Sequence, residues 1–417
     1  MRIVATSVFL VLAFLILLPA RSFAAEQPNI VFIITDDQGY GELACHGNPI
    51  LSTPNLDKLH GESVRFTRFQ VSPTCAPTRA ALMTGRHEFK CGVTHTILER
   101  ERLALGIPTF PELLRDAGYT TGIFGKWHLG DQDPYRPDQR GFDEVFIHGA
   151  GGIGQSYDGS CGDAPDNKYF DPHILHSNVF EKTDGYCTDL FFAEATKWIA
   201  ANKDKPFFAY ISLNAPHYPY HAPPQYEKIY LDKGLEKTQA NYYGMIENID
   251  DNVGALMGKL EEWDIENETL VVFMTDNGRA GGGGRGLFNA GMKGEKGTPH
   301  EGGTRVPCFF RWKGHLPVGV DVERVTAHID MLPTLAEIAG AVIPEDARLD
   351  GRSMVPLLND ASAEWQDRYL FTHVGRWPRG KEEEFKYRKF SVRSERFRLV
   401  GRDQLYDMQN DPGQTTN

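Results

Sequence analysis

The sequence predicts an α/β protein with a large, mixed but mostly parallel sheet flanked by helices. Four short apolar runs have the composition of buried strands: 29–35, 120–124, 207–213 and 269–275. Stretches with helical character lie between these runs, at 109–117, 190–200 and 242–262. Strands that alternate with helices are typical of a parallel sheet. A hydrophobic content of 41% over 417 residues supplies a full core, so disorder and coiled coil are excluded as descriptions of the whole chain.

The pattern along the chain predicts an unequal domain organisation. The length by itself allows two or three domains, or one large α/β domain with an appendage. An amphipathic helix closed by Gly340 is expected at 330–340. Beyond residue 366 the pattern changes to short alternating strands at 369–374, 389–393, 397–400 and 405–407. We therefore expect a signal peptide (1–24), an α/β domain (25–365) and a small antiparallel C-terminal subdomain (366–417).

The first 24 residues have the features of a cleaved signal peptide. Arg2 supplies a short positive region, residues 8–18 form an apolar run, and small residues precede the expected cut after Ala24, with Ala25 as the next choice. An N-terminal membrane anchor is the alternative, but the run is shorter than the roughly 20 residues that span a bilayer. No later stretch of the sequence is long and apolar enough to cross a membrane. We expect a secreted or periplasmic protein without stable membrane insertion.

The composition is acidic, with 44 Lys and Arg against 56 Asp and Glu and a formal charge of −12. Because residues 1–24 contain two arginines and no acid, their removal makes the charge of the mature chain −14. Proteins that bind nucleic acid present a basic face, so this balance argues against nucleic acid as a partner.

Export allows disulfides, and the chain has six cysteines, at positions 45, 75, 91, 161, 187 and 308. The sequence does not fix their pairing. Cys161 and Cys187 flank a loop rich in Gly, Asp and Asn and are the favoured bridge. No CxxC or Cys/His spacing indicates a zinc site.

Each predicted strand is followed by a cluster of polar residues. Taken singly, an Asp after a strand is most often a helix cap or a turn former, and a lone His or Lys is usually solvated. Four such endings at one edge of one sheet instead indicate a ligand site, because ligands bind at the carboxyl ends of parallel strands. The clusters are Asp36-Asp37, Lys126-Trp127-His128, Asn214-Ala215-Pro216-His217 and Asp276-Asn277.

The acidic members of these clusters have the chemistry of a hard-cation site. Three carboxylates and an amide carbonyl suit Ca²⁺ or Mg²⁺ rather than zinc. The candidate ligands are Asp36, Asp37, Asp276 and Asn277. The Lys and His residues would flank the cation and contact an anion bound to it.

Cys75 is predicted to lie at a helix N-terminus. Pro77 suits the first turn of the helix, and Arg79 follows one turn after the cysteine. Free backbone N–H groups there favour an anion and a thiolate, although a buried structural thiol is the ordinary alternative. A reactive cysteine is the first interpretation. However, a cysteine nucleophile does not normally work beside an oxygen-ligated cation, so the combination needs another explanation.

The run Cys75-x-Pro77-x-Arg79, continued by Ala-Ala-Leu-Met-Thr-Gly, resembles the signature of the formylglycine-dependent (type I) sulfatases of the alkaline-phosphatase-like superfamily. Further segments follow in the order found in that family, from Pro28 to about residue 340. They are Asp36-Asp37, Gly125-Lys126-Trp127-His128-Leu129-Gly130, Ala215-Pro216-His217, Asp276-Asn277-Gly278 and the run 296–307.

The resemblance implies the fold, the cofactors and the reaction. The fold would be the alkaline-phosphatase-like α/β fold, and a formylglycine-generating enzyme would convert Cys75 to Cα-formylglycine. The four candidate ligands would hold Ca²⁺, with Mg²⁺ as the second choice. The hydrate of residue 75 would hydrolyse O-sulfate esters of a sulfated carbohydrate or an aryl alcohol through a covalent sulfo-enzyme intermediate.

The resemblance also implies roles for the basic residues. Arg79 and Lys126 would orient the hydrate and favour its ionised form. His217 or Lys296 would donate a proton to the departing oxygen, with His217 favoured. His128 would take the proton of the second hydroxyl, which releases sulfate.

Other residues are secondary candidates around this site. Ser156 or Asp158 would bind sulfate, and Lys293 is a second basic group. Glu301 and Arg305 are expected to be a structural pair. Arg376 and Trp377 could reach substrate from the C-terminal subdomain, and His221, His300 and the loop 149–170 could recognise it. In the family the Leu405-Tyr406-Asp407 segment precedes a further helix, so the subdomain is expected to be incomplete.

Two other functions are compatible with the motifs. One is a phosphodiesterase or phosphonate monoester hydrolase of the same superfamily. The other is an inactive protein that binds sulfated glycans, which would be expected to lack a metal ligand or the nucleophile, and none is missing here. The sequence does not indicate the sulfated position, exo or endo action, or the oligomeric state.

Overall fold

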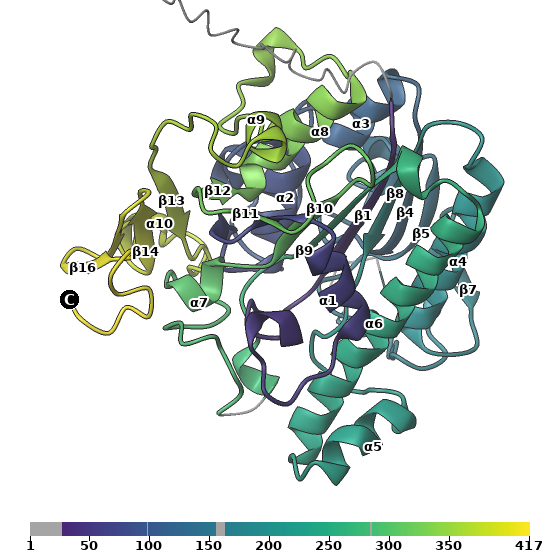
Figure 1. The fold of residues 1–417 in the computed structure, drawn as a ribbon, viewed down its shortest axis with the longest axis horizontal. Helices are drawn as coiled ribbons and strands as arrows, with labels where there is room; N and C mark the ends of the chain where they lie inside the picture. Colours follow the sequence, from purple (N-terminus) through teal and green to yellow (C-terminus); the bar gives the residue numbers. More distant parts are fainter. Residues whose placement is uncertain (1–26, 98, 156–162, 284–285) are drawn as a thin grey trace, which may run out of the picture.

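In the computed structural model, which describes residues 27–417 except 98, 156–162 and 284–285, the chain is built around a ten-stranded sheet (Figure 1). The central strands β9, β1, β8, β4 and β5 are parallel, whereas β10, β6 and β7 each run antiparallel to a neighbour. In spatial order the strands are β11 (Val320–Val322), β2 (Val64–Phe66), β10 (Cys308–Arg311), β9 (Thr269–Thr275), β1 (Asn29–Thr35), β8 (Phe207–Ser212), β4 (Thr120–Lys126), β5 (Glu144–His148), β6 (His173–His176) and β7 (Val179–Lys182).

The four predicted apolar strands are confirmed, and they are neighbours in the sheet in the order β9-β1-β8-β4. Their last residues are in register, since Thr35 pairs with Thr275 and Ile34 pairs with Ser212. All four strands run in one direction, so the polar segments that follow them meet at the same edge of the sheet.

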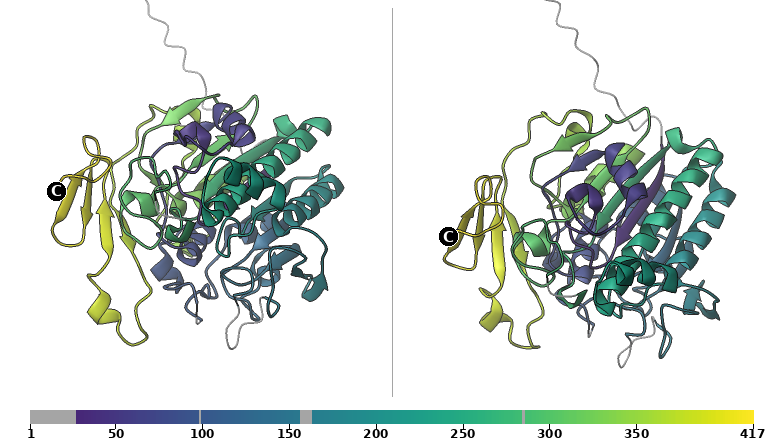
Figure 2. Two further views of the ribbon diagram at one scale, coloured as in Figure 1. Left: turned by 90° about the horizontal axis from the view of Figure 1, so that it is seen from below. Right: turned by 60° about the horizontal axis from the view of Figure 1, so that its bottom comes forward.

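Helices cover both faces of the sheet, which explains why these strands are apolar throughout (Figures 1 and 2). In β1, Ile30, Phe32 and Ile34 pack on one face, whereas Val31 and Ile33 pack on the other. The first face carries α2 (Cys75–Thr84), α3 (Phe110–Asp116), α8 (Met331–Ala339) and α9 (Val355–Asn359). The second carries α1 (Pro54–Gly61), α4 (Cys187–Asn202), α5 (Pro224–Asp232) and α6 (Lys237–Glu262). The helices predicted at 109–117, 190–200, 242–262 and 330–340 are thus confirmed.

A four-stranded antiparallel sheet lies beside the main sheet, as the sequence predicted (Figure 2). It consists of β13 (Leu370–His373), β14 (Phe390–Arg393), β15 (Phe397–Val400) and β16 (Gln404–Asp407), with α10 (Glu382–Phe385) between its first two strands. β3 (Phe69–Gln70) and β12 (Thr326–Ala327) form a separate two-stranded sheet.

The predicted pair of Glu301 and Arg305 is wrong. Glu301 begins α7 (Glu301–Thr304) and forms a buried ion pair with Arg398 of β15, at 2.8 Å. The Arg305 Nε donates to the Thr67 carbonyl at 2.7 Å, and its guanidinium lies over the Tyr40 ring. Glu301 pairs with Arg398 because the C-terminal sheet packs on α7 and brings this arginine to it.

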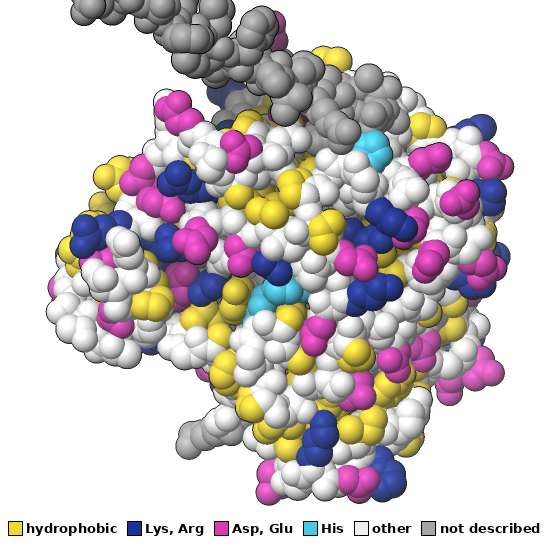
Figure 3. All heavy atoms as spheres, in the orientation of Figure 1, with side chains coloured by type: hydrophobic (Ala, Val, Ile, Leu, Met, Phe, Trp, Pro, Cys, Tyr) yellow, Lys and Arg dark blue, Asp and Glu magenta, His cyan; other side chains and the backbone are white. Residues whose placement is uncertain are grey.

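Part of the sequence interpretation lies outside the described residues, namely the signal peptide and Cys161. Cys187, the expected partner of Cys161, is a buried free thiol whose Sγ contacts Asn214 Oδ1 at 3.6 Å. Among the described helices, none combines the length and apolar character needed to cross a membrane. On the face shown in Figure 3, acidic and basic side chains are interspersed, and no single basic patch covers this face.

Candidate active site

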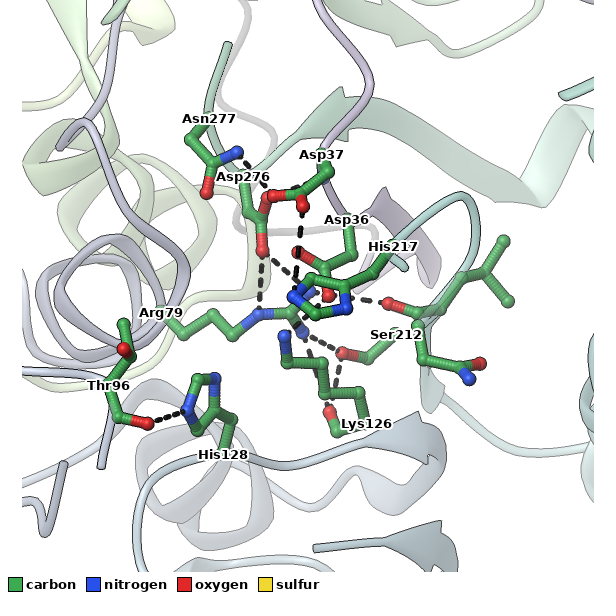
Figure 4. Close-up of polar contacts among 12 residues, drawn as sticks. Asp36, Asp37, Arg79, Thr96, Lys126, His128, Ser212, His217, Asp276 and Asn277 are labelled. Atoms are coloured by element: carbon green, nitrogen blue, oxygen red, sulfur yellow. Dashed lines mark hydrogen bonds and ion pairs between the residues drawn. The ribbon is translucent and has the colours of Figure 1, made fainter. Parts of the chain in front are cut away.

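The acidic residues after β1 and β9 form a buried cluster at the edge of the sheet (Figure 4). Asp36, Asp276 and Asn277 are fully buried, and Asp37 is 2% exposed. The Asp37 backbone N–H donates to Asp276 Oδ1 at 3.2 Å, and Asn277 Nδ2 donates to Asp37 Oδ1 at 2.9 Å. Among the described residues, Asp36 Oδ1 and Asn277 Oδ1 have no hydrogen-bond partner.

The electrostatics of this cluster are those of a cation site. Burial raises the pKa of Asp36 and Asp276 above the ordinary carboxyl range, and acidic neighbours add to the shift although Lys126 and Arg79 oppose it. At Asp37, Lys296 and His217 outweigh burial and hold the pKa well below its usual range. The orphaned oxygens and the all-oxygen donor set fit a hard cation such as Ca²⁺ or Mg²⁺.

Three positively charged side chains bind the carboxylates: Lys126 and Arg79 are buried, and Lys296 is partly exposed. Lys126 Nζ donates to Asp36 Oδ2 at 2.5 Å, and Lys296 Nζ donates to Asp37 Oδ2 at 2.7 Å. The Arg79 guanidinium binds Asp276 Oδ2 through Nε and Nη2, at 3.0 and 2.9 Å.

The other hydrogen bonds of the Arg79 guanidinium go to acceptors on neighbouring strand ends and not to residue 75. They donate to the Ser212 hydroxyl and to the carbonyls of Lys126 and Leu213. Arg79 therefore fixes Asp276 and acts on residue 75 through its charge. Ser212, the last residue of β8, was not among the predicted site residues.

Cys75 is the first residue of α2, as predicted, and its side chain lines the same cavity as Asp37, His217 and Lys296. Ligand atoms of Cys75, Asp36 and Asp276 all lie within 4.8 Å of one another. Burial alone would raise the pKa of Cys75, but Lys126, Lys296 and His128 outweigh it and hold the pKa well below the usual thiol range. The position therefore stabilises an anionic nucleophile next to the carboxylate cluster.

His128 has its Nδ1 free to act as a base towards residue 75. Its Nε2 lies 2.9 Å from the Thr96 carbonyl and 3.5 Å from Glu101 Oε2. Because a carbonyl only accepts, Nε2 carries a hydrogen, and the neutral ring keeps its lone pair on Nδ1, which is buried and has no partner among the described residues. Burial and Lys126 lower the pKa of His128, but Cys75 and Glu101 outweigh them and raise it to about 9. The ring is therefore protonated at neutral pH while residue 75 is anionic, and it becomes a base once that negative charge is lost.

His217 faces the carboxylates from the segment after β8. Its Nδ1 donates to the Tyr218 carbonyl at 2.6 Å, which leaves Nε2 at 3.7 Å from Asp37 Oδ2. The buried Tyr169 hydroxyl holds this segment through the carbonyls of Asn214 and His217, at 3.0 and 2.7 Å. Burial lowers the pKa of His217 to about 4 although Asp37 opposes the shift.

The cavity above the cluster has a volume of about 500 Å³. Besides the predicted residues, it is lined by groups that the sequence did not single out, including His95, Thr96, Tyr218 and Tyr220. The two tyrosines closely follow His217 and could have been suspected from that spacing. His95 and Thr96 lie in a loop without periodicity, so no sequence signal marked them.

Some of the secondary candidates line the catalytic cavity, and others do not. Arg376 lines the cavity, as do Gly151 and Gln155 of the loop 149–170. The proposal for Trp377 is wrong, because its ring packs edge-on against Phe89 and its face is covered by Arg100. Ser156 and Asp158 lie outside the described residues.

Three further candidates point elsewhere. His221 lines a separate groove beside α5, and Lys293 donates to the Tyr406 hydroxyl at 2.9 Å. His300 packs edge-on near the Tyr406 ring.

Comparison with known proteins identifies the family. The Sulfatase family model matches residues 28–341, and the model for the C-terminal part of N-sulphoglucosamine sulphohydrolase matches residues 294–417. The chain is 33% identical over 397 residues to mouse N-acetylgalactosamine-6-sulfatase, covering 89% of this chain and 73% of that protein. It is 35% identical over 374 residues to human arylsulfatase A, covering 82% and 70%.

Solved structures agree with this assignment. A crystal structure of Ps i-CgsB in complex with k-i-k-neocarrahexaose has a TM-score of 0.83 at 30% identity and covers 94% of this chain and 88% of that chain. Phosphonate monoester hydrolase of Agrobacterium radiobacter has a TM-score of 0.67 at 22% identity over 94% and 91% of the two chains, which shows the common fold alone. The chain belongs to the sulfatase family and is a sulfuric ester hydrolase with the alkaline-phosphatase-like fold.

Proposed function

We propose that the protein hydrolyses O-sulfate esters of a sulfated carbohydrate or an aryl alcohol through a formylglycine hydrate at residue 75. The observation that carries this proposal is the position of Cys75. It lies at a helix N-terminus, beside a buried carboxylate cluster, with Lys296 in the same cavity and the charge of the buried Lys126 acting on it. The names of its relatives, which include an arylsulfatase and a sulfatase of a sulfated sugar, support the substrate class.

The metal in this proposal is Ca²⁺, with Mg²⁺ as the second choice. The ion would be held by Asp36, Asp37, Asp276 and Asn277, and when bound it supplies a Lewis acid for the sulfate oxygens and for the nucleophile. The unpartnered oxygens of Asp36 and Asn277 support this ligand set. Lys126 holds the other oxygen of Asp36, and Lys296 contacts both oxygens of Asp37, so the two lysines fix the orientation of these carboxylates.

The reaction follows from the groups around residue 75. One hydroxyl of the hydrate, ionised beside Lys126, forms a bond from its oxygen to sulfur while the bond from sulfur to the ester oxygen breaks. The departing oxygen takes a proton from His217 or Lys296. His128 Nδ1 then removes the proton of the second hydroxyl, the carbon–oxygen bond to sulfate breaks, and the aldehyde is restored as sulfate leaves. Addition of one water to the aldehyde regenerates the hydrate for the next turnover.

Two steps of maturation belong to the proposal. A formylglycine-generating enzyme would modify Cys75, and the chain would be exported after cleavage near Ala24. The Cys75-x-Pro77-x-Arg79 signature and the N-terminal pattern support them. Protein from the natural host should therefore begin near Ala25, and the peptide with residue 75 should have one oxygen in place of sulfur and two hydrogens.

The central test compares the wild type with Cys75→Ser on p-nitrophenyl sulfate. The serine can accept sulfate but has no second hydroxyl to expel it, so we expect a single turnover and a stable sulfate ester at residue 75. Continued turnover by the serine variant would contradict the mechanism. Faster cleavage of bis(p-nitrophenyl) phosphate by the wild type would favour the phosphodiesterase alternative, and an unmodified thiol without turnover would favour the inactive glycan-binding protein.

A further inference from the structure

Arg376 brings a positive charge from the C-terminal subdomain to the catalytic cavity. It follows β13 and lines the same cavity as Cys75 and His128. Within the described residues, its guanidinium makes one side-chain hydrogen bond, from Nη2 to the Thr96 hydroxyl at 3.4 Å. Within the described part of the chain, no carboxylate lies within ion-pair distance of it, whereas the neighbouring Arg379 contacts Glu99. The Arg376 fork is thus available to an anionic ligand.

The backbone on both sides of Arg376 is fixed to the loop that precedes Arg100. A Cβ on Gly375 would lie 1.7 Å from the Thr94 carbonyl oxygen, so only glycine permits this approach. The Arg376 N–H donates to the same carbonyl at 3.2 Å. On the other side, Arg100 donates to the Trp377 carbonyl, and its guanidinium lies 4.9 Å from the centre of the indole ring.

This attachment holds Arg376 in an unusual backbone conformation. Its φ of +24° is rare for a residue other than glycine, and such conformations persist only where the surroundings enforce them. Gly375 and Trp377 supply that constraint. The anchors act on the backbone and leave the Arg376 side chain exposed.

His95 provides a second donor on the same wall of the cavity. Its Nδ1 accepts the Thr96 backbone N–H at 2.7 Å, so the neutral ring carries its hydrogen on Nε2. Burial, together with Arg100 and Arg376, lowers the pKa of His95 to about 4, which keeps the ring neutral at physiological pH. Arg376 therefore supplies the charge, and His95 supplies a neutral hydrogen-bond donor.

We propose that Arg376 and His95 form a second anion-binding subsite, so that the preferred substrate is a saccharide with a second acidic group near the sulfate ester that is cleaved. The second group is a sulfate or a carboxylate. The cavity of about 500 Å³ is within the range of about 300–1,000 Å³ that holds whole small-molecule ligands. Tyr218, which is 63% exposed, adds an aromatic surface for a sugar ring. This inference depends on the proposed sulfatase function.

The test uses substrates that differ only in the second acidic group. Sulfate release is measured for N-acetylgalactosamine 6-sulfate and 4,6-disulfate, for galactose 6-sulfate and 2,6-disulfate, and for 6-sulfated N-acetylgalactosamine linked to uronic acid or to its neutral glucose counterpart. A sugar that is not hydrolysed is scored as a competitive inhibitor of p-nitrophenyl sulfate hydrolysis. Each pair thus gives a selectivity ratio from kcat/KM or from the inhibition constant, and the disulfated and uronic pairs distinguish sulfate from carboxylate.

Wild-type enzyme should prefer at least one doubly acidic compound by about tenfold or more, as expected for a charge-assisted bidentate contact. Arg376→Ala should bring that ratio close to one, and Arg376→Lys should give an intermediate ratio because it keeps the charge without the fork. Arg379→Ala is the matched control in the same loop and should keep the wild-type ratio.

Two results would overturn the inference, and they differ from failure of the proposed function. In the first, the wild type shows no preference for any doubly acidic compound. In the second, Arg376→Ala lowers kcat/KM by the same factor for singly and doubly acidic substrates. Failure of the proposed function would instead appear as no hydrolysis of any sulfate ester, p-nitrophenyl sulfate included, by protein with formylglycine at residue 75.

Discussion

At the scale of single residues, the site depends on two residues that follow strands and have a left-handed backbone conformation. Asp37 and His128 both follow a strand and both have positive φ values, of 66° and 60°. Such conformations cost about 1–3 kcal/mol for residues other than glycine and are concentrated at functional sites. Here they direct one carboxylate towards Lys296 and one imidazole towards residue 75, so the strain is located where the chemistry is proposed.

The residue that donates a proton to the departing oxygen can be identified by comparing substrates with a poor and a good leaving group. Lys296 carries a proton at neutral pH, whereas burial lowers the pKa of His217 to about 4. If Lys296 is the donor, Lys296→Ala should lower kcat/KM for a sulfated sugar by about 10²–10⁴-fold, and much less for p-nitrophenyl sulfate, whose phenolate needs little help to leave. His217→Ala provides the comparison. A larger leaving-group effect in that variant would assign the role to His217, as the sequence analysis favoured.

Two adjacent glycines set the space around the catalytic histidines. A Cβ on Gly151 would lie 2.8 Å from His128 Nε2, and a Cβ on Gly152 would lie 2.8 Å from His217 Nδ1. Gly151→Ala and Gly152→Ala should therefore displace one histidine each and lower kcat by about 10²-fold, since a small misplacement of a catalytic group has this effect.

The control for these variants is Gly258→Ala in α6. Nothing lies within 4 Å of a Cβ at that position. It should retain activity and gain up to about 1 kcal/mol of stability from the better helix propensity of alanine. Normal activity of Gly151→Ala would show that the His128 ring can move without loss.

At the scale of elements, the site is the meeting point of four parallel strand ends and one helix N-terminus. β9, β1, β8 and β4 supply the acidic, basic and histidine segments, and α2 places residue 75 among them. Strands buried on both faces are rigid, so they fix the positions of the residues that follow them. This arrangement also buries two carboxyl groups, those of Asp36 and Asp276, and raises their pKa values.

Metal removal should therefore destabilise this edge of the sheet. A ligand that binds only the folded state at 100 times its Kd adds about 2.7 kcal/mol of stability. Chelation should lower the melting temperature by several degrees, and Ca²⁺ should restore it. Asn277→Ala, which removes one unpartnered oxygen, should reduce the Ca²⁺-dependent shift, whereas the surface variant Asp264→Asn should keep it. An unchanged shift in Asn277→Ala would remove Asn277 from the ligand set.

At the scale of the whole molecule, the C-terminal sheet completes the catalytic cavity and is fixed by buried charges. Glu301 of α7 pairs with Arg398 at 2.8 Å, and Arg398 also donates to the Pro299 carbonyl at 2.8 Å. Arg376 enters the cavity from this same subdomain. Globally the chain has a charge of −12, yet the cavity contains Lys296 and Arg376, so its local field differs from that of the whole protein.

The buried pair predicts a pH dependence of stability. Burial would raise the pKa of Glu301, but Arg398 and Arg393 outweigh it and hold the pKa below 4.5, its value in the unfolded chain. The pair therefore stabilises the fold fully above that value, and this contribution is lost as the pH falls through the lower folded-state pKa. Glu301→Gln should lower the unfolding free energy at pH 7 by about 3 kcal/mol, because it leaves a buried arginine unpaired.

The measurement is thermal unfolding of Glu301→Gln and wild type between pH 7 and pH 3. The difference in melting temperature should be largest near neutral pH and should shrink below about pH 4.5. Glu337→Gln, at an exposed position of α8, is the control and should follow the wild type. A constant difference across this range would show that the effect comes from packing rather than from the charge of Glu301.

The sequence by itself determined the strands and the helix that begins at Cys75. It also indicated the residues proposed for catalysis and metal binding, of which Lys296 came only from the family resemblance. These were readable because their signals are local: a β-branched run ends in acid, amide or histidine, and Pro77 marks a first helical turn. The alternation of strands and helices then placed all of these ends at one edge of a parallel sheet.

Only the tertiary structure decided which distant side chains meet. Arg376 and Thr96 are 280 residues apart in the sequence, and Glu301 pairs with Arg398 rather than with Arg305 nearby. Ser212 and His95 likewise became visible only through their neighbours. The physical reason is that a charge or a hydroxyl can bind any complementary group within a few ångströms, and the sequence carries no periodic record of which group the packing of two subdomains brings there.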